Sequence, residues 1–150
     1  MNPYQKGNSA YKKSAVNTTD QGTLILMLYD GTIRFLKIAS KKIAASDLEG
    51  AHQSISKAKN IISELMTSLN PEQTGRVGTS LKSLYVYMFN RLIDANIQKK
   101  AEYVDEVCEL MAELREGWQA VINKKKEASA AQNPMKFNNR SELKPVSIRG

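Results

Sequence analysis

Hydrophobic residues recur every three or four positions from about residue 20 to residue 124, the spacing that lines one side of an α-helix. The stretch 24–36 has two apolar stripes instead of one. One contains Leu24, Leu28, Phe35 and Ala39, and the other contains Leu26, Tyr29, Ile33 and Leu36. Both stripes must be covered, so this helix either lies deep in a bundle or reserves one stripe for another polypeptide.

Cap and turn residues divide the pattern into helices. Asp20 is a candidate N-cap for a first helix that runs to about Ala45, and 46–49 (Ser-Asp-Leu-Glu) matches a capping box that would start a second. The second helix carries one unbroken seam, formed by Leu48, Ala51, Ile55, Ala58, Ile62, Leu65 and Leu69. Asn70-Pro71 would end it, and the polar segment up to Gly78 predicts an exposed loop.

The third predicted helix, about 79–98, again has two apolar stripes. The first contains Leu81, Leu84, Met88, Leu92 and Ala95, and the second contains Val86, Phe89, Ile93 and Ile97. The fourth, about 102–124, has a single seam formed by Val104, Val107, Met111, Leu114, Trp118 and Val121. Four amphipathic helices with short links predict an all-α, antiparallel four-helix bundle over residues 20–124.

The two ends of the chain differ from this middle part. Residues 1–19 form an N-terminal arm with few apolar side chains, and residues 125–150 are rich in Ala, Ser, Asn, Lys and Pro without a hydrophobic period. That composition predicts a disordered C-terminal tail.

Length and composition fit one soluble domain. With 150 residues, of which 41% are hydrophobic, the chain can bury a core. No apolar run approaches the roughly 20 residues needed to span a bilayer, and the first residues lack the apolar segment of a signal peptide. We therefore expect a cytoplasmic protein with no direct membrane insertion. Cys108 is the only cysteine, so the chain cannot form an internal disulfide.

The net charge of +7 comes from the ends of the chain. Residues 18–123 hold twelve Lys or Arg against thirteen Asp or Glu, which gives a net charge of −1, whereas 124–150 hold seven against two. A nucleic-acid-binding fold carries its positive charge on the face that meets the phosphates. The distribution argues against a nucleic-acid partner for the folded part.

Candidate catalytic chemistry is sparse. His52 is the only histidine, and Glu49-Gly-Ala-His52 matches only one of the two Glu-x-x-His motifs that a two-iron bundle needs. Gly75-Arg-Val-Gly78 resembles a GXXG loop in its letters alone. No nucleophile–base pairing and no phosphate-binding glycine loop is indicated, so we expect a non-enzyme without cofactor or metal. The excess apolar surface favours a protein that binds other proteins, although a central bundle helix explains it equally well.

Several segments resemble the FliS family, the flagellin-specific export chaperones of bacteria. Leu-Met-Leu-Tyr-Asp-Gly at 26–31, followed by Ile-Arg-Phe-Leu at 33–36, is similar to the first helix of that family. Further matching pieces fall in the family's order: 2–4, 10–11, 16–18, 58–65, 84–88, 91–92, 95–96 and 114–118. Together they cover about residues 2–122, and so many pieces in the family's order are hard to obtain by chance.

The resemblance implies a function and its partners. FliS-like proteins bind the disordered C-terminal segment of flagellin, prevent premature polymerisation and deliver flagellin to the flagellar type III export apparatus. The implied partners are the flagellin C-terminal segment, a flagellar export-gate protein and other flagellar regulators. An amphipathic segment that becomes helical in a groove of the bundle would bury a large contact area and still be releasable, because ordering the segment costs entropy.

Nine residues are candidates for contact with these partners: Tyr11, Val16, Leu26, Tyr29, Ile33, Val86, Phe89, Ile93 and Ile97. By the resemblance, the arm with Tyr11 and Val16 would cover a groove in the empty protein, and Tyr11 would take part in docking at the export gate. Residue types alone do not say which apolar faces form the core and which form the groove.

Two other functions remain open at this point. A helical adaptor or regulatory subunit unrelated to flagella could use the same grooves for another amphipathic helix, and the basic tail could bind RNA. An association that survives high salt and needs the apolar residues of the first and third helices would favour a chaperone or adaptor. A salt-sensitive association lost with residues 124–150 would favour RNA.

Overall fold

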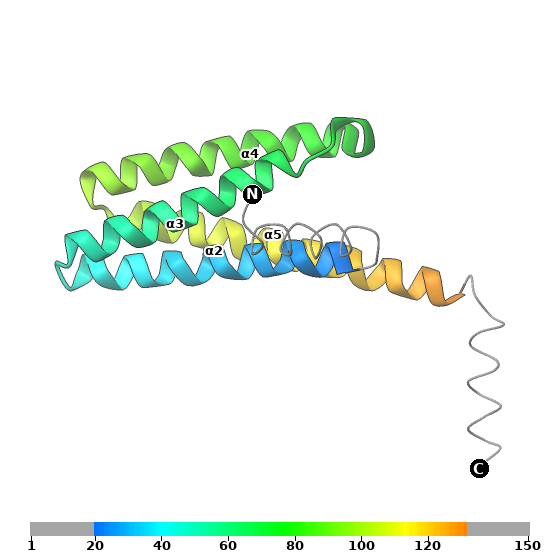
Figure 1. The fold of residues 1–150 in the computed structure, drawn as a ribbon, viewed down its shortest axis with the longest axis horizontal. Coiled ribbons are helices and arrows are strands. Elements are labelled where there is room, and N and C mark those ends of the chain that lie inside the picture. Colours follow the sequence, from blue (N-terminus) through cyan, green and yellow to red (C-terminus); the bar gives the residue numbers. More distant parts are fainter. Residues whose placement is uncertain (1–19, 132–150) are drawn as a thin grey trace, which may run out of the picture. The chain divides into compact units, whose positions relative to one another are not determined.

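The structure, a computed structural model, describes residues 20–131 as four helices (Figure 1). They are α2 (Asp20–Ala44), α3 (Leu48–Thr67), α4 (Pro71–Gln98) and α5 (Ala101–Ala131). Links of two or three residues join them, so successive helices run antiparallel. Within 20–131 no residue is in a strand. The prediction of an all-α four-helix bundle is confirmed, whereas the arm and the tail beyond residue 131 lie outside the described residues.

The chain divides into two compact units within α5. The first extends to Glu116 and holds α2, α3, α4 and the first part of α5, and the second begins at Gly117. In the second unit, residues 117–131 continue as helix past the predicted end at Lys124. The predicted end was wrong, because the segment from Lys124 to Ala131 is rich in Lys, Glu and Ala, which are good helix formers even without an apolar seam.

The start of α3 differs in detail from the predicted capping box. Asp47, not Ser46, is the N-cap, and its Oδ1 accepts a hydrogen bond of 3.0 Å from the backbone N–H of Gly50. Ser46 has a φ of 61° and belongs to the turn between the helices. Lys42 pairs with the Asp47 carboxylate at 3.2 Å. The pKa of Asp47 lies below its ordinary value, first because of the Gly50 hydrogen bond and then because of Lys42.

The predicted loop 70–78 is also wrong. Helix α4 starts at Pro71, with the Asn70 side chain accepting from the N–H of Glu72 at 3.0 Å. A kink interrupts it at Gly75, where φ is 55° and ψ is −131°, a conformation in which a side chain is strained. Asn70 is the N-cap and Pro71 is the first helical residue. These residue types favour those two positions as well as loops.

The core of the first unit is built from buried side chains of all four helices. The largest side chains that are essentially closed to solvent include Tyr85, Leu36, Ile55, Ile62, Leu65, Met88, Leu92, Met111, Val104 and Val107. Helix α2 uses both of its stripes. Tyr29 and Leu36 are buried, while Phe35 of the other stripe lies against α3, with the ammonium of Lys57 at 5.4 Å from its ring centroid. Both stripes of α2 therefore meet neighbouring helices, since Tyr29 hydrogen-bonds to Tyr85 of α4 and Phe35 lies against α3.

Polar contacts join the helices around this core. The Tyr29 and Tyr85 hydroxyls hydrogen-bond at 2.5 Å between α2 and α4, and Arg115 of α5 pairs with Asp30 of α2. Between α4 and α5, Glu106 accepts hydrogen bonds from Tyr87 and from the Nε of Arg91. The Tyr87 and Arg91 donors hold the pKa of Glu106 below its usual range.

Candidate protein-binding surface

The second stripe of α4 faces outward. Val86 is 41% exposed and Ile97 is 76% exposed, whereas Phe89 and Ile93 are half-buried. We call these four residues the α4 stripe. Their spacing of three, four and four places them on one side of the helix, opposite the buried Met88, Leu92 and Ala95. The opposite side of α4 therefore packs into the core, while the α4 stripe keeps Val86 and Ile97 open to solvent.

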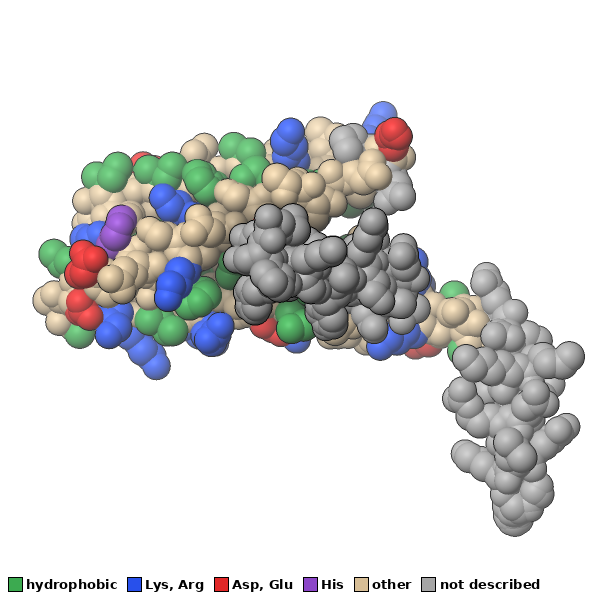
Figure 2. Space-filling model, viewed as in Figure 1, with side chains coloured by type: hydrophobic (Ala, Val, Ile, Leu, Met, Phe, Trp, Pro, Cys, Tyr) green, Lys and Arg blue, Asp and Glu red, His purple; other side chains and the backbone are tan. Residues whose placement is uncertain are grey.

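Helix α3 borders the α4 stripe. The ammonium of Lys59 lies 5.5 Å from the centroid of the Phe89 ring, and an Asn96–His52 hydrogen bond of 2.8 Å ties the C-terminal end of α4 to α3. Figure 2 shows hydrophobic side chains gathered along α4, with Lys or Arg side chains beside them. An apolar strip with a basic border suits the apolar side of an amphipathic helix.

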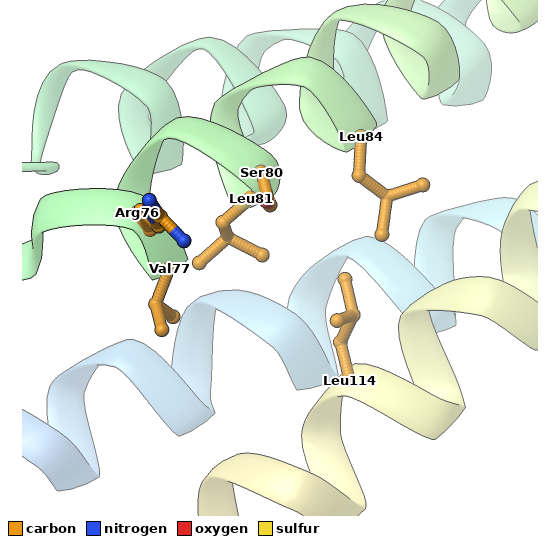
Figure 3. Close-up of a pocket in the computed structure, with 6 residues that line it drawn as sticks. All are labelled: Arg76, Val77, Ser80, Leu81, Leu84 and Leu114. Carbon is orange, nitrogen blue, oxygen red and sulfur yellow. The ribbon is translucent and has the colours of Figure 1, made fainter.

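A recess opens on the other side of α4, nearer its N-terminal end. It has a volume of about 380 Å³ and is lined by Arg76, Val77, Ser80, Leu81, Leu84 and Leu114. Figure 3 shows Leu84 of α4 and Leu114 of α5 pointing toward one another across it. Val77 is 74% exposed and follows the kink at Gly75. The recess, which we call the α4–α5 recess, could take one or two large apolar side chains of a partner.

The structure separates the nine residues that the sequence singled out. Leu26 and Tyr29 lie in the core, and Ile33 is half-buried, with its carbonyl 3.9 Å from the Sγ of Cys108. The four α4 residues form the α4 stripe. Tyr11 and Val16 lie outside the described residues. The partner-binding role of all nine stays a prediction. Among those that the structure describes, Ile97 and Val86 expose the most apolar surface.

Sequence reasoning did not find the α4–α5 recess or the basic border. Arg76 and Val77 fall in the segment interpreted as a loop, where Val77 was the one apolar signal. Lys59 was hidden because its neighbours on α3 form a seam that faces the core, and only the packing of α3 against α4 brings it to Phe89.

The titratable groups show no arrangement for catalysis among residues 20–131. The half-buried Cys108 thiol has a pKa raised chiefly by burial, which disfavours the reactive thiolate. No three His, Cys, Asp or Glu side chains gather closely enough in the described part to hold a metal ion. None of the helices described is long and apolar enough to cross a membrane. Beside the α4 stripe, the surface offers apolar contact and positive charge.

Comparison with known proteins gives a family. Residues 2–125 match the model of the family described as Flagellar protein FliS. The Flagellar secretion chaperone FliS of Bacillus subtilis (strain 168) is 35% identical over 122 residues, which cover 81% of this chain and 87% of that protein. The protein of the same name from Salmonella typhimurium is 34% identical over 113 residues, or 75% and 84% of the two chains.

A solved structure shares the fold. It is described as the crystal structure of a flagellar chaperone from bacteria, and it aligns with a TM-score of 0.67 at 17% identity, covering 81% of this chain and 99% of that one. At this identity the likeness concerns the fold alone. The match over residues 2–125, together with relatives above 30% identity, places the resemblance noted in the sequence on firm ground: the chain belongs to the FliS family of flagellar secretion chaperones.

Proposed function

We propose that this protein is a cytoplasmic, non-enzymatic export chaperone that binds the disordered C-terminal segment of flagellin. In this proposal it prevents premature polymerisation and delivers flagellin to an export-gate protein of the flagellar type III apparatus. The observation that carries the proposal is the α4 stripe, an outward apolar surface on a helix whose other side already completes the core. Membership of a family of secretion chaperones supports the choice of a flagellar client.

The physical role of the α4 stripe follows from the client's chemistry. An amphipathic segment without a partner exposes its apolar side and associates with other copies. When it becomes helical along α4, that side is covered by Val86, Phe89, Ile93 and Ile97, and the α4–α5 recess receives further apolar side chains. Ordering the segment costs about 2–5 kcal/mol, which keeps a large interface releasable at the export gate.

The arm is part of the same proposal. Tyr11 and Val16 would cover apolar surface while the chaperone is empty, and Tyr11 would contact the export gate. Deleting residues 1–17 should change both the flagellin affinity and the solubility of the empty protein. If neither quantity changed, the arm would have no such role.

The test of the binding surface is substitution in the α4 stripe. Covering the exposed three quarters of Ile97 is worth about 1–2 kcal/mol, given about 1.5–3 kcal/mol for a whole Ile side chain. Ile97→Glu loses this and places a carboxylate in the interface, so affinity should fall about tenfold or more. Fluorescence anisotropy with the labelled C-terminal segment of the flagellin from the same organism measures it.

Met27→Glu is the matched control. Met27 is 62% exposed on α2, outside the α4 stripe, so its substitution introduces the same charge on another exposed apolar position. Thermal unfolding of both variants should stay near that of the wild type, because neither side chain is buried. Equal losses of affinity for the two variants, or no loss for Ile97→Glu, would contradict binding at the α4 stripe.

A further inference from the structure

The border of the α4 stripe carries positive charge. On the α3 side, the Lys59 ammonium sits over Phe89, and Lys82 precedes Val86 by one turn of α4. At the C-terminal end, Lys99 donates a hydrogen bond to the Asn96 side chain. None of these lysines forms a salt bridge with a described residue.

The carboxylates near this border hydrogen-bond or pair with other groups, or lie on another side of α4. Glu106 accepts from Tyr87 and Arg91 on the side of α4 that meets α5, and Asp94 lies on that same side, seven residues after Tyr87. At the start of α3, Glu49 accepts a hydrogen bond from Gln53, and Asp47 pairs with Lys42. Among the described residues, no carboxylate therefore forms a salt bridge with the lysines beside the α4 stripe.

From this charge distribution we infer that the segment bound on the α4 stripe is an amphipathic helix with carboxylates on the flank that meets Lys59 and Lys82. The inference rests on the proposed function, because the occupant is the client of that proposal, and it adds the client's charge pattern. Lys82 precedes Phe89, over which Lys59 lies, by seven residues, or about 10.5 Å along a helix axis. A client helix lying along α4 would meet both lysines with carboxylates about two turns apart.

These charges would select the register of the client helix more than they add to its affinity. The apolar residues of the α4 stripe repeat every three or four positions, so a client helix shifted by one turn would still cover them. A shift of one turn moves the carboxylates away from the lysines. Complementary charge also speeds association and suppresses wrong pairings, and its effect weakens with salt.

Lys57 provides a matched control on the same helix. It lies on the opposite side of α3 and places its ammonium over the Phe35 ring of α2 at 5.4 Å, much as Lys59 lies over Phe89 at 5.5 Å. Lys57→Glu and Lys59→Glu change the net charge equally, and each removes one cation–π contact. They differ in which face of the bundle loses its positive charge.

The experiment measures binding of the flagellin C-terminal segment to the wild type, K59E, K82E and K57E at about 50 mM and about 500 mM salt, where screening differs strongly. We expect K59E and K82E each to weaken binding by about two- to fivefold at the lower salt, the range of exposed ion pairs, and K57E to have little effect. The differences should shrink at the higher salt. Thermal unfolding of each variant provides the folding control.

A second probe is the same flagellin segment with every Asp and Glu replaced by Asn and Gln. It should bind the wild type and K59E equally. If K59E and K82E matched K57E, or if the amide segment still distinguished K59E from the wild type, the inference would be overturned. In that case a loss with Ile97→Glu would leave the proposed function standing, whereas no binding to the wild type would refute the proposed function itself.

Discussion

The Tyr29–Tyr85 pair gives the sharpest prediction about stability. Both side chains are 2% exposed, and their hydroxyls hydrogen-bond to each other at 2.5 Å between α2 and α4. The pair has two O–H protons, of which one serves this bond and the other has no acceptor among the described residues. The perturbations are Tyr29→Phe, Tyr85→Phe and the double variant.

The expected free energies of unfolding are not additive. Each single variant removes one hydroxyl and leaves the other buried without its partner, which costs about 1–2 kcal/mol. The double variant removes both polar groups and keeps both rings, so its stability should lie within about 0.5 kcal/mol of the wild type or above it. Urea unfolding followed by circular dichroism measures all four proteins. If the double variant lost the sum of the two single losses, the hydroxyl pair would not be a coupled buried unit.

The same pair predicts a pH dependence. Burial is the main reason that the pKa values of Tyr29 and Tyr85 are both raised above 10. The unfolded chain therefore ionises first, so stability is fully present below about pH 10 and is lost as the pH rises further. The double Phe variant should lose less stability above pH 10 than the wild type. Parallel curves for the two proteins would contradict the raised pKa values.

Two further predictions concern helix ends. The Asp47 cap has a lowered pKa, so its stabilising effect is present above the ordinary Asp pKa and is lost as the pH falls through the lower folded value. Asp47→Asn can still cap the helix but does not titrate, so this variant should lose less stability at acid pH than the wild type. An unchanged acid side of the stability curve would refute this. Gly75→Ala places a Cβ at a φ of 55° and a ψ of −131°, so the midpoint of urea unfolding should fall by the equivalent of about 1–3 kcal/mol, and an unchanged midpoint would mean that the kink does not hold in solution.

Much of the fold could be predicted from the sequence, because the seams of α3 and α5 repeat every three or four residues, and most α3 members (Ala51, Ile55, Ala58, Ile62, Leu65) and the first three α5 members (Val104, Val107, Met111) are buried in the core. The two-striped helices could not be assigned in the same way. Leu26 and Val86 have similar apolar neighbours in sequence, yet one is 8% exposed and the other 41%. What separates them is that α2 is covered by neighbours on both of its stripes, which no local pattern encodes.

The sequence did not predict the start of α4 or the basic border of the α4 stripe, and the reasons differ. Asn70, Pro71 and Gly75 are typical both of loops and of a capped, kinked helix start, so residue type does not decide between the two. Lys59 gains its significance from the ring of Phe89, thirty positions later in the chain. A contact across that separation depends on how α3 packs on α4, and it becomes visible only in three dimensions.

The central claim is that this chain binds the C-terminal segment of flagellin and makes it helical. Isothermal titration calorimetry with the isolated segment, accompanied by circular dichroism of the mixture, tests it most directly. We expect a 1:1 complex whose helicity exceeds the sum of the separate components. No heat and no added helicity at concentrations up to about 1 mM, where binding would be negligible, would contradict the claim.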